Sequence, residues 1–526
     1  MGHGHQLVAI CTTDGRFLTW AEGRSIPHFD SLARLASFIE EHPIDYLFSI
    51  VNYSIVPGAL LKAPRRLAIN YHDALLPRYA GTYSTTWAIL NGENVHGISW
   101  HVMVEDVDAG DVLKQVKIPI ADNDTALTLN YKCFGEAARS FSGLIEDLET
   151  GVITAQKQDL TERTYFEFCH RPPGACLIPF DSTAREINSF CRALDFGNYA
   201  NPIGVPKLAI GEGFFAVAGT EVTSVPSQMT PGSVAGIDGE CLTLASRTYD
   251  VRLKGITTLG GAEMTPGKLA DRFNISTGVI LNAIEAPRMT RIGSLHRRTC
   301  THERFWLQQL VRLRPAEVPG AQAAGAPAHS WQVLAVHPGC RPLDALAQLP
   351  GLGRAADVLL CLHAIFLGRL SCGPSDFGYA DTGLTAEVTG IEELFAACVP
   401  ARFAVDASLD ALLSGLERLR KGITYMRDIG IRHPGSGLHD PMGDSGAGSL
   451  TSYPIVLRLF GPRSRPDERL GTQLTVNIGS DGVSCLWVYN NLVIREDVAE
   501  RLRSEFEMFL SQAVRSLLRN EAERLA

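Results

Sequence analysis

The first third of the chain alternates short apolar runs with amphipathic segments, and this alternation constrains the fold more than any other feature. Asp30 can cap an amphipathic helix between the first two runs, and a long helix is expected from Asp124 to Gly151. This rhythm predicts an α/β fold, a doubly wound parallel sheet covered by helices on both faces. The apolar runs of strand length are Leu7–Cys11, Tyr46–Val51, Leu67–Asn70 and Ile98–Val104.

The rhythm changes after residue 163. A helix is expected at 184–194, and the segments that follow are short, apolar and separated by glycine, which predicts a small barrel or sandwich. Residues 314–330 are rich in Ala, Pro and Gly and are typical of a linker. A second α/β unit is expected from residue 331. Its expected elements are helices at 354–370 and 407–427, a strand at 483–489 and a final amphipathic helix.

Composition and charge narrow the class of protein. The chain has 526 residues, of which 45% are apolar, so several globular domains are expected. A net charge of −9 disfavours a protein that binds nucleic-acid phosphates. The longest apolar stretch is too short to span a membrane and the N-terminus does not resemble a signal peptide, so we expect a cytoplasmic protein. Twelve cysteines without a CxxC pair predict reduced thiols and no metal site.

The most informative polar residues lie at the ends of expected strands. Asn70 and His72 are two positions apart in a strand, so their side chains project to the same side. Asp108 follows the next strand and can reach the same end of the sheet. An amide, an imidazole and a carboxylate can stabilise an oxyanion and move a proton during direct acyl transfer to an amine. Taken alone, these residue types are also ordinary at turns and strand ends.

The stretch from Leu67 to Asp111 resembles formyltransferases that use 10-formyltetrahydrofolate, which include methionyl-tRNA formyltransferase, glycinamide ribonucleotide transformylase and sugar N-formyltransferases. The family motif is Asn-x-His before a Ser-Leu-Leu-Pro-like loop, followed by an Asp-x-Gly-Asp turn, and here it appears as NYHDALLP and DAGD. The resemblance implies that Asn70 and His72 stabilise the oxyanion while Asp108 orients His72 and assists proton removal. Ala74 stands where the family usually has Ser, so the rim that faces the substrate is expected to differ.

The same resemblance assigns the donor site. It places two loops against the pterin ring, largely through backbone hydrogen bonds, and His101 in a supporting position. Judged from the residues alone, Ile55, Val56 and Val107 can equally belong to the core. The residues that the resemblance assigns to the two loops are Tyr53, Ser54, Ile55, Val56, Val104, Glu105, Asp106 and Val107.

The rest of the chain resembles parts of larger enzymes. The stretches near residues 180 and 230–261 resemble the linker helix and small barrel of methionyl-tRNA formyltransferase, and several segments are most similar to formyltransferase regions fused to nonribosomal peptide synthetases. The last 200 or so residues resemble the C-terminal half of a condensation domain. No two histidines are adjacent, so the condensation motif is absent and a docking or structural role is expected. The usual first strand and helix of the formyltransferase domain are also expected to be missing before residue 5.

The expected organisation has four parts: the formyltransferase domain (1–165), a linker helix and small β-barrel (166–270), a connecting helix and linker (271–330), and the condensation-like lobe (331–526). The expected reaction moves a formyl group from 10-formyltetrahydrofolate to the amine of an amino acid or a carrier-tethered aminoacyl group. An adenylation or carrier protein is a possible partner, with no nucleic acid or membrane. The alternatives are a formyl donor hydrolase, an amino-sugar N-formyltransferase and a non-catalytic docking protein.

Overall fold

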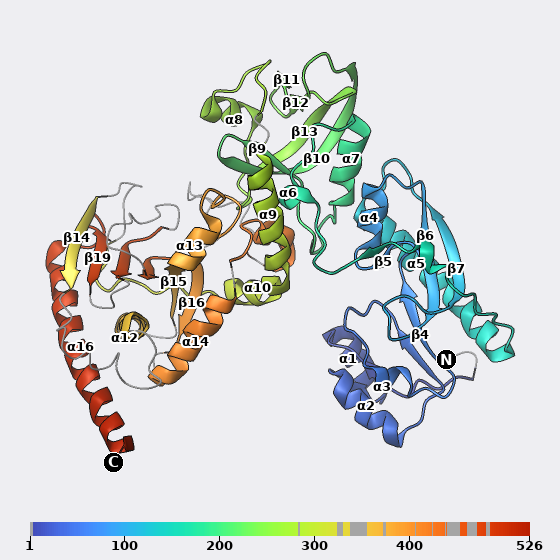
Figure 1. Cartoon of the computed structure of the whole chain (residues 1–526), viewed down its shortest axis with the longest axis horizontal. Coiled ribbons are helices and arrows are strands. Elements are labelled where there is room, and N and C mark those ends of the chain that lie inside the picture. Colours follow the sequence, from blue (N-terminus) through green and yellow to red (C-terminus); the bar gives the residue numbers. More distant parts are fainter. Residues whose placement is uncertain are drawn as a thin grey trace. The chain divides into compact units, whose positions relative to one another are not determined.

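The chain divides into two compact units in a computed structural model (Figure 1). The first unit comprises residues 1–170 and 182–197, and the second comprises 171–181 and 198–526. The structure describes residues 4–281, 284–322, 330–336, 355–371, 375–404, 407–422, 424–436, 438, 453–459, 471–479 and 484–525. Part of the expected linker and most of the glycine-rich loop from His433 to Gly448 lie outside the described residues.

A four-stranded sheet organises the first unit, in the order β3 (Tyr46–Ser49), β4 (Leu67–His72), β6 (Val95–Val102) and β7 (Val112–Pro119). Strands β3 and β4 are parallel, whereas β4 pairs antiparallel with β6 and β6 pairs antiparallel with β7. The prediction of a parallel sheet is therefore wrong for two of the three strand pairings, and the sheet is mixed. The physical reason is the short connection 103–111, which can join antiparallel neighbours but not parallel ones.

A smaller layer precedes this sheet. Strands β1 (Ile10–Cys11) and β2 (His28–Phe29) form a parallel pair around helix α1 (Gly15–Glu22). Helix α2 (Leu32–Glu41) begins after Ser31, whose hydroxyl accepts the N–H of Arg34, so the helix starts one residue later than Asp30 predicts. Helices α2 and α3 (Gly58–Leu61) bury Leu35, Ile39 and Leu60 in one cluster.

One long helix packs on the main sheet of the first unit. Helix α5 (Ala126–Thr150) contacts β6 and β7 and buries its Leu129 and Leu144 against Ile98 and Trp100 of the sheet. Its cap is Thr125 rather than Asp124, because Thr125 and Thr128 form a reciprocal capping box. Gly151, with φ of 70°, ends the helix as predicted. Helices α4 (Ser84–Leu90) and α7 (Ala184–Ala193) contact each other, while β5 (Ala80–Gly81) pairs with β8 (Tyr165–Phe166).

The second unit contains a five-stranded antiparallel sheet in the order β11-β12-β13-β10-β9. The short spacing of these strands along the chain agrees with the small β structure that glycine punctuation predicts. Its strands are β9 (Lys207–Ile210), β10 (Gly213–Pro226), β11 (Val234–Ile237), β12 (Leu242–Leu244) and β13 (Tyr249–Thr258). Helices follow as α8 (Pro266–Phe273), α9 (Ala286–Thr299) and α10 (Glu303–Val311), with the short α6 (Pro173–Cys176) packed on α9.

The C-terminal part of this unit is a six-stranded mixed sheet in the order β14-β19-β18-β17-β15-β16. Helix α12 (Ala355–Leu370) is buried almost throughout because it contacts the sheet, α14 and α16 (Figure 1). The strands are β14 (Trp331–Val336), β15 (Ser375–Asp381), β16 (Val399–Phe403), β17 (Ile455–Leu459), β18 (Leu474–Ile478) and β19 (Cys485–Asn490). The other helices are α13 (Thr382–Val388), α14 (Leu409–Lys421), α15 (Ile429–Arg432) and α16 (Glu496–Leu525).

A buried network of charges connects these parts of the second unit. Lys207 on β9 lies 2.6 Å from a carboxylate oxygen of Asp428, and Asp428 accepts a 2.8 Å hydrogen bond from Arg432. Arg432 also pairs with Glu303 at 2.6 Å and donates to the carbonyl of Asn201. The side chains of Lys207, Asp428 and Arg432 are 0–1% exposed, so the network holds the β9 sheet against the C-terminal part without water between them.

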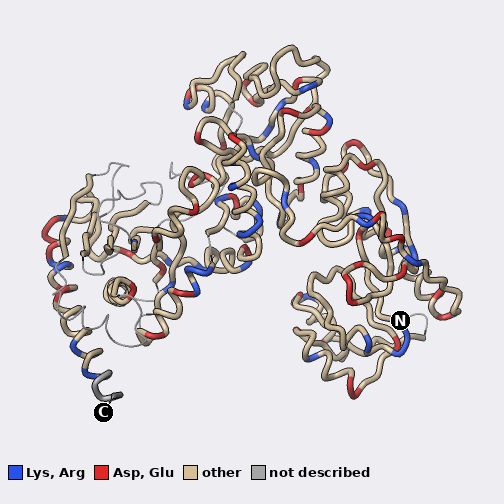
Figure 2. The backbone as a smooth tube through the Cα atoms, in the orientation of Figure 1, with Lys and Arg blue, Asp and Glu red and all other residues tan. Residues whose placement is uncertain are grey.

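Charge on the surface is mixed. Figure 2 shows acidic and basic residues interspersed along the described chain. Within the described residues, none of the helices is both long enough and apolar enough to pass through a lipid bilayer.

Candidate active site

Strands β4 and β6 bring the first three site residues together. Asn70 and His72 lie at the end of β4, and the antiparallel register places His101 of β6 directly opposite Asn70. Directly opposed residues share a face of the sheet, so Asn70, His72 and His101 project to the same side. The Nδ2 atom of Asn70 lies 3.1 Å from Nε2 of His101.

Asp108 completes the cluster from the loop between β6 and β7. One of its carboxylate oxygens lies 3.6 Å from Nδ1 of His72, and the other lies 3.3 Å from Nε2 of His101. Asn70 donates to the same carboxylate at 3.4 Å. His72, His101 and Asp108 are each at most 9% exposed, and Asn70 is the half-buried member of the group. The three residues predicted to carry the chemistry, together with His101, therefore meet in one place.

Hydrogen bonds to main-chain carbonyls orient both histidines. Nε2 of His72 donates to the carbonyl of Tyr79 at 2.8 Å, and Nδ1 of His101 donates to the carbonyl of Val102 at 2.9 Å. Each of these nitrogens must carry a proton because a carbonyl oxygen only accepts. The remaining nitrogen of each ring then faces Asp108.

The surroundings of Asp108 keep it ionised. Burial raises the pKa of its carboxyl, but the charge of His72, the hydrogen bond with His101 and the N–H of Gly81 outweigh burial and hold the pKa below its ordinary value. The Asp108 backbone has a φ of +54°, which is uncommon for a residue other than glycine. A permanent negative charge is thus fixed beside the two imidazoles.

Two glycines allow the loops around the cluster to approach closely. A Cβ at Gly110 would lie 1.9 Å from the carbonyl oxygen of Val102, and one at Gly81, whose φ is +97°, would lie 2.2 Å from the carbonyl oxygen of Phe166. Neither position can hold a side chain without a main-chain shift. Ser99 fixes the loop that begins at Ala74, since it donates to the Ala74 carbonyl at 2.6 Å and accepts the N–H of Leu76 at 3.1 Å.

A family comparison covers the part of the chain that holds this cluster. Residues 30–142 match the family model described as Formyl transferase, and this range contains the whole cluster. The chain contains a formyl transferase domain. The catalytic class predicted from the motif is thereby confirmed for this part of the chain.

Solved structures that resemble the chain also include formyltransferases. WlaRD, described as a sugar 3N-formyl transferase in the presence of dTDP and 5-N-formyl-THF, is 18% identical, with 47% of this chain and 86% of that chain covered and a TM-score of 0.36. An N-formyltransferase from Helicobacter canadensis, in complex with folinic acid and dTDP-3-aminofucose, is 19% identical, with 45% of this chain and 81% of that chain covered and a TM-score of 0.35. HypX from Aquifex aeolicus, in complex with tetrahydrofolic acid, is 13% identical, with 54% of this chain and 50% of that chain covered and a TM-score of 0.38. At these scores the assignment of the formyl transferase domain rests on the family match and the site geometry.

The two loops assigned to the donor lie next to each other in the formyl transferase domain. Lys62, which follows the 53–56 loop, pairs with Glu105 of the other loop at 3.3 Å. Ile55 is 81% exposed and Val107 is 39% exposed, so the alternative that they belong to the core is wrong. Val56 is partly buried against the cluster formed by α2 and α3. Both loops present apolar side chains to solvent, namely Ile50, Val51, Tyr53, Ile55, Val104 and Val107.

Two functional candidates were not predicted from the sequence of the formyl transferase domain. Gln158 donates to the carbonyls of Asp108 and Gly110, and Arg163 donates to the carbonyl of Val107. Their partners are main-chain atoms 48–56 residues earlier. No side-chain pattern signals such contacts, although both residues lie shortly after the helix that ends at Gly151.

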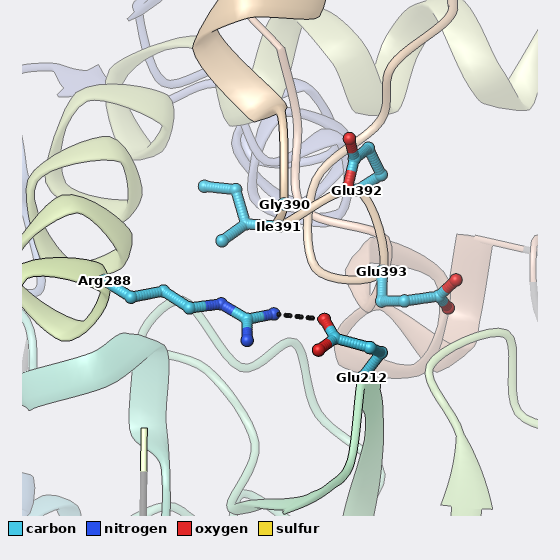
Figure 3. A pocket seen from close by; sticks show the side chains of 6 residues that line it. All are labelled: Glu212, Arg288, Gly390, Ile391, Glu392 and Glu393. Carbon is cyan, nitrogen blue, oxygen red and sulfur yellow. Dashed lines mark hydrogen bonds and ion pairs between the residues drawn. The ribbon is translucent and has the colours of Figure 1, made fainter. Parts of the chain in front are cut away.

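A separate pocket is formed by residues of the second unit alone. It has a volume of about 210 Å³, and Figure 3 shows Arg288 reaching Glu212 across it at 3.1 Å, with Glu392 and Glu393 on the adjoining loop. In the described part of the chain, histidine, cysteine and acidic side chains do not gather into a group of three or more that could hold a metal ion.

Proposed function

We propose that the chain is an N-formyltransferase that moves a formyl group from 10-formyltetrahydrofolate to a primary amine. The observation that carries the proposal is the convergence of Asn70, His72 and Asp108 beside two exposed apolar loops within a formyl transferase domain. The exposed apolar side chains fit the flat faces of a pterin ring, because their burial against those faces on binding would stabilise the complex.

The donor supplies the formyl carbon that the amine attacks. Negative charge then develops on the formyl oxygen, and the Nδ2 group of Asn70 with Nδ1 of His72 stabilises it. Asp108 keeps His72 oriented and positively polarised because its carboxylate lies 3.6 Å from Nδ1. The same carboxylate, through a water, accepts the proton that the attacking amine loses. Tetrahydrofolate leaves when the bond between its nitrogen and the formyl carbon breaks, and that nitrogen takes up the proton that the amine has lost, which restores the Asp108 carboxylate.

The acceptor class is a further part of the proposal. An amino acid or an aminoacyl group tethered to a carrier protein is favoured by the resemblance to formyltransferase regions of nonribosomal peptide synthetases. The net charge of −9 and the interspersed surface charge also favour such an acceptor over tRNA (Figure 2). In this reading, the C-terminal lobe is a condensation-like docking or structural part, and an adenylation or carrier protein is the partner.

The test is an assay of the purified full chain with 10-formyltetrahydrofolate and separate panels of amino acids, carrier-bound aminoacyl groups and nucleotide-linked amino sugars. We expect tetrahydrofolate to form only when an amine is present. His72→Ala should lower the rate by a factor of about 10²–10⁴, the usual contribution of such a group. His5→Ala is the control, because His5 is a 43% exposed histidine of the same unit that pairs with Glu149.

Each alternative gives a different result. Formate released without an acceptor would indicate a donor hydrolase, and activity confined to amino sugars would indicate a sugar N-formyltransferase. A folded chain that binds no folate in calorimetry would indicate a non-catalytic docking protein. Equal activity of His72→Ala and the wild type would contradict the proposed mechanism.

A further inference from the structure

Gln158 touches the turn that carries Asp108 but none of the groups assigned to the chemistry. Its side-chain nitrogen donates to the carbonyl of Asp108 at 2.9 Å and to that of Gly110 at 2.6 Å. Gln158 is 8% exposed. The two carbonyl acceptors identify this atom as the amide nitrogen, because the amide oxygen would repel both.

The other end of the Gln158 amide shows that this arrangement has a cost. Its oxygen is buried and has no hydrogen-bond partner. An unpaired buried acceptor is unfavourable, because it has lost its hydrogen bonds to water and gained none in the protein. An apolar side chain at this position would avoid that cost. What the Gln158 amide provides in return is its two hydrogen bonds to the turn.

The Asp108 turn needs such support. A φ of +54° at an aspartate is a sparsely populated conformation that persists when its surroundings hold it in place. The N–H of Gly81 bonds the carboxylate at 2.8 Å. On the main chain, Arg163 holds the Val107 carbonyl and the N–H of Ala109 donates to the Asp106 carbonyl at 3.3 Å, but neither contact reaches the carbonyls of Asp108 and Gly110. The bonds from Gln158 hold the main chain at two carbonyls, one on each side of the Ala109 residue between them.

The support itself is anchored. Gln156 forms two 2.8 Å backbone hydrogen bonds with Val112, at the start of β7. Asp159 then caps the 3₁₀ turn Leu160–Glu162 by accepting from the N–H of Thr161. Gln158 lies between these two fixed points, so its side chain has a defined position from which to hold the turn.

We propose that Gln158 is a positioning residue for formyl transfer, which holds the Asp108 turn so that the carboxylate stays between His72 and His101. The inference rests on the proposed function for its kinetic consequence. It assigns Gln158 no contact with the donor, the acceptor or the reacting atoms. Its loss should therefore affect the chemical step through Asp108 and leave binding of the formyl donor unchanged.

The kinetic test uses Gln158→Met, which keeps the length of the side chain and removes the donor. The matched control is Gln156→Met, since Gln156 is exposed and its contacts with Val112 are main-chain contacts. We expect Gln158→Met to lower kcat by about 10–100-fold, as a misplaced catalytic group does, with KM for 10-formyltetrahydrofolate unchanged. In an Asp108→Asn background the same substitution should lower kcat by less than about 2-fold, because the group that it positions is already lost.

A second measurement does not require activity. Hydrogen–deuterium exchange of the 108–111 segment, where Gln158 binds the two carbonyls, should be faster in Gln158→Met than in Gln156→Met or the wild type. Unchanged exchange, an unchanged kcat, or a kcat loss that multiplies fully with that of Asp108→Asn would each overturn the role of Gln158. An inactive wild type combined with faster exchange would instead retain Gln158 as the support of the turn and reject the proposed function.

Discussion

At the scale of single residues, the Asp108 carboxylate couples the stability of the site to pH. The pKa of this carboxyl is held below its ordinary value although burial alone would raise it. A carboxyl whose pKa is lower in the folded chain adds stability above its unfolded pKa of about 4. That stability is lost as the pH falls from about 4 through the folded pKa.

Asp108→Asn should therefore destabilise the first unit at pH 7. The expected loss is about 1.5–3 kcal/mol, the contribution of hydrogen bonds to a charged group. For a unit of this size, this corresponds to a decrease in Tm of about 2–4 °C per kcal/mol. Calorimetry at pH 7, 5 and 3.5 measures the difference in unfolding free energy between variant and wild type. This difference should be equal at pH 7 and pH 5 and smaller at pH 3.5. A difference that grows in acid would contradict the sign of the pKa shift.

The sequence predicted which residues lie together at the candidate site because they follow strand geometry and a recognisable motif. Asn70 and His72 alternate along one strand, and Asp108 lies in a turn whose DAGD pattern resembles the family motif. Gln158 carried no such signal. Its acceptors are carbonyl oxygens, which every residue has, so only the folded main chain reveals the contact.

At the scale of elements, the β6–β7 hairpin is where expectation and structure differ most. The apolar run of β6 predicted a strand but not its direction, since a strand buried on both faces looks alike in either orientation. The direction follows from the short 103–111 connection, and that connection also carries Asp108. The antiparallel turn thus places the carboxylate beside the strand that holds His101.

Gly110→Ala should show how tightly this hairpin is closed. The added Cβ would meet the Val102 carbonyl at 1.9 Å, which only a main-chain shift can relieve. We expect a loss of about 1–3 kcal/mol in the free energy of unfolding. A fall in kcat should accompany it, because the carbonyl that Gln158 binds moves.

The control for that substitution is Gly15→Ala at the first position of α1, where nothing lies within 4 Å of the added atom. It should leave both activity and thermal stability unchanged or slightly raise the latter. Equal effects of the two substitutions would show that close packing of the hairpin does not limit the site.

At the scale of the whole molecule, the buried charges of the second unit connect segments that are far apart in the sequence. Burial lowers the pKa of the Arg432 guanidinium, yet the charges of Asp428 and Glu303 outweigh it and raise that pKa above its usual value. The pKa of Glu303 falls to about 2, although burial raises it, because of Arg432 and His433. Arg432, Glu303 and Asp428 therefore stay charged at neutral pH, and each depends on its partners to offset its removal from water.

Lys207→Met should destabilise the second unit by about 3–5 kcal/mol, because Asp428 would lose its closest partner. The double variant Lys207→Met/Asp428→Asn should lose less stability than the sum of the losses in the two single variants. Arg247→Met is the control, since Arg247 and Asp181 form an exposed pair that contributes less than about 1 kcal/mol. Thermal unfolding of the four variants measures these differences, and additive losses would contradict a coupled network.

The same network limits how this chain can be divided. Phe214 and Leu259 of the β9–β13 region share one apolar cluster with Leu394 and Met426 of the C-terminal part. A protein cut at residue 330 would expose that cluster and leave Lys207 as an uncompensated ammonium group in an apolar surface. Transfer of the formyl transferase domain to another protein by recombination would therefore succeed more readily with a breakpoint near residue 198 than with one in the Ala/Pro-rich segment.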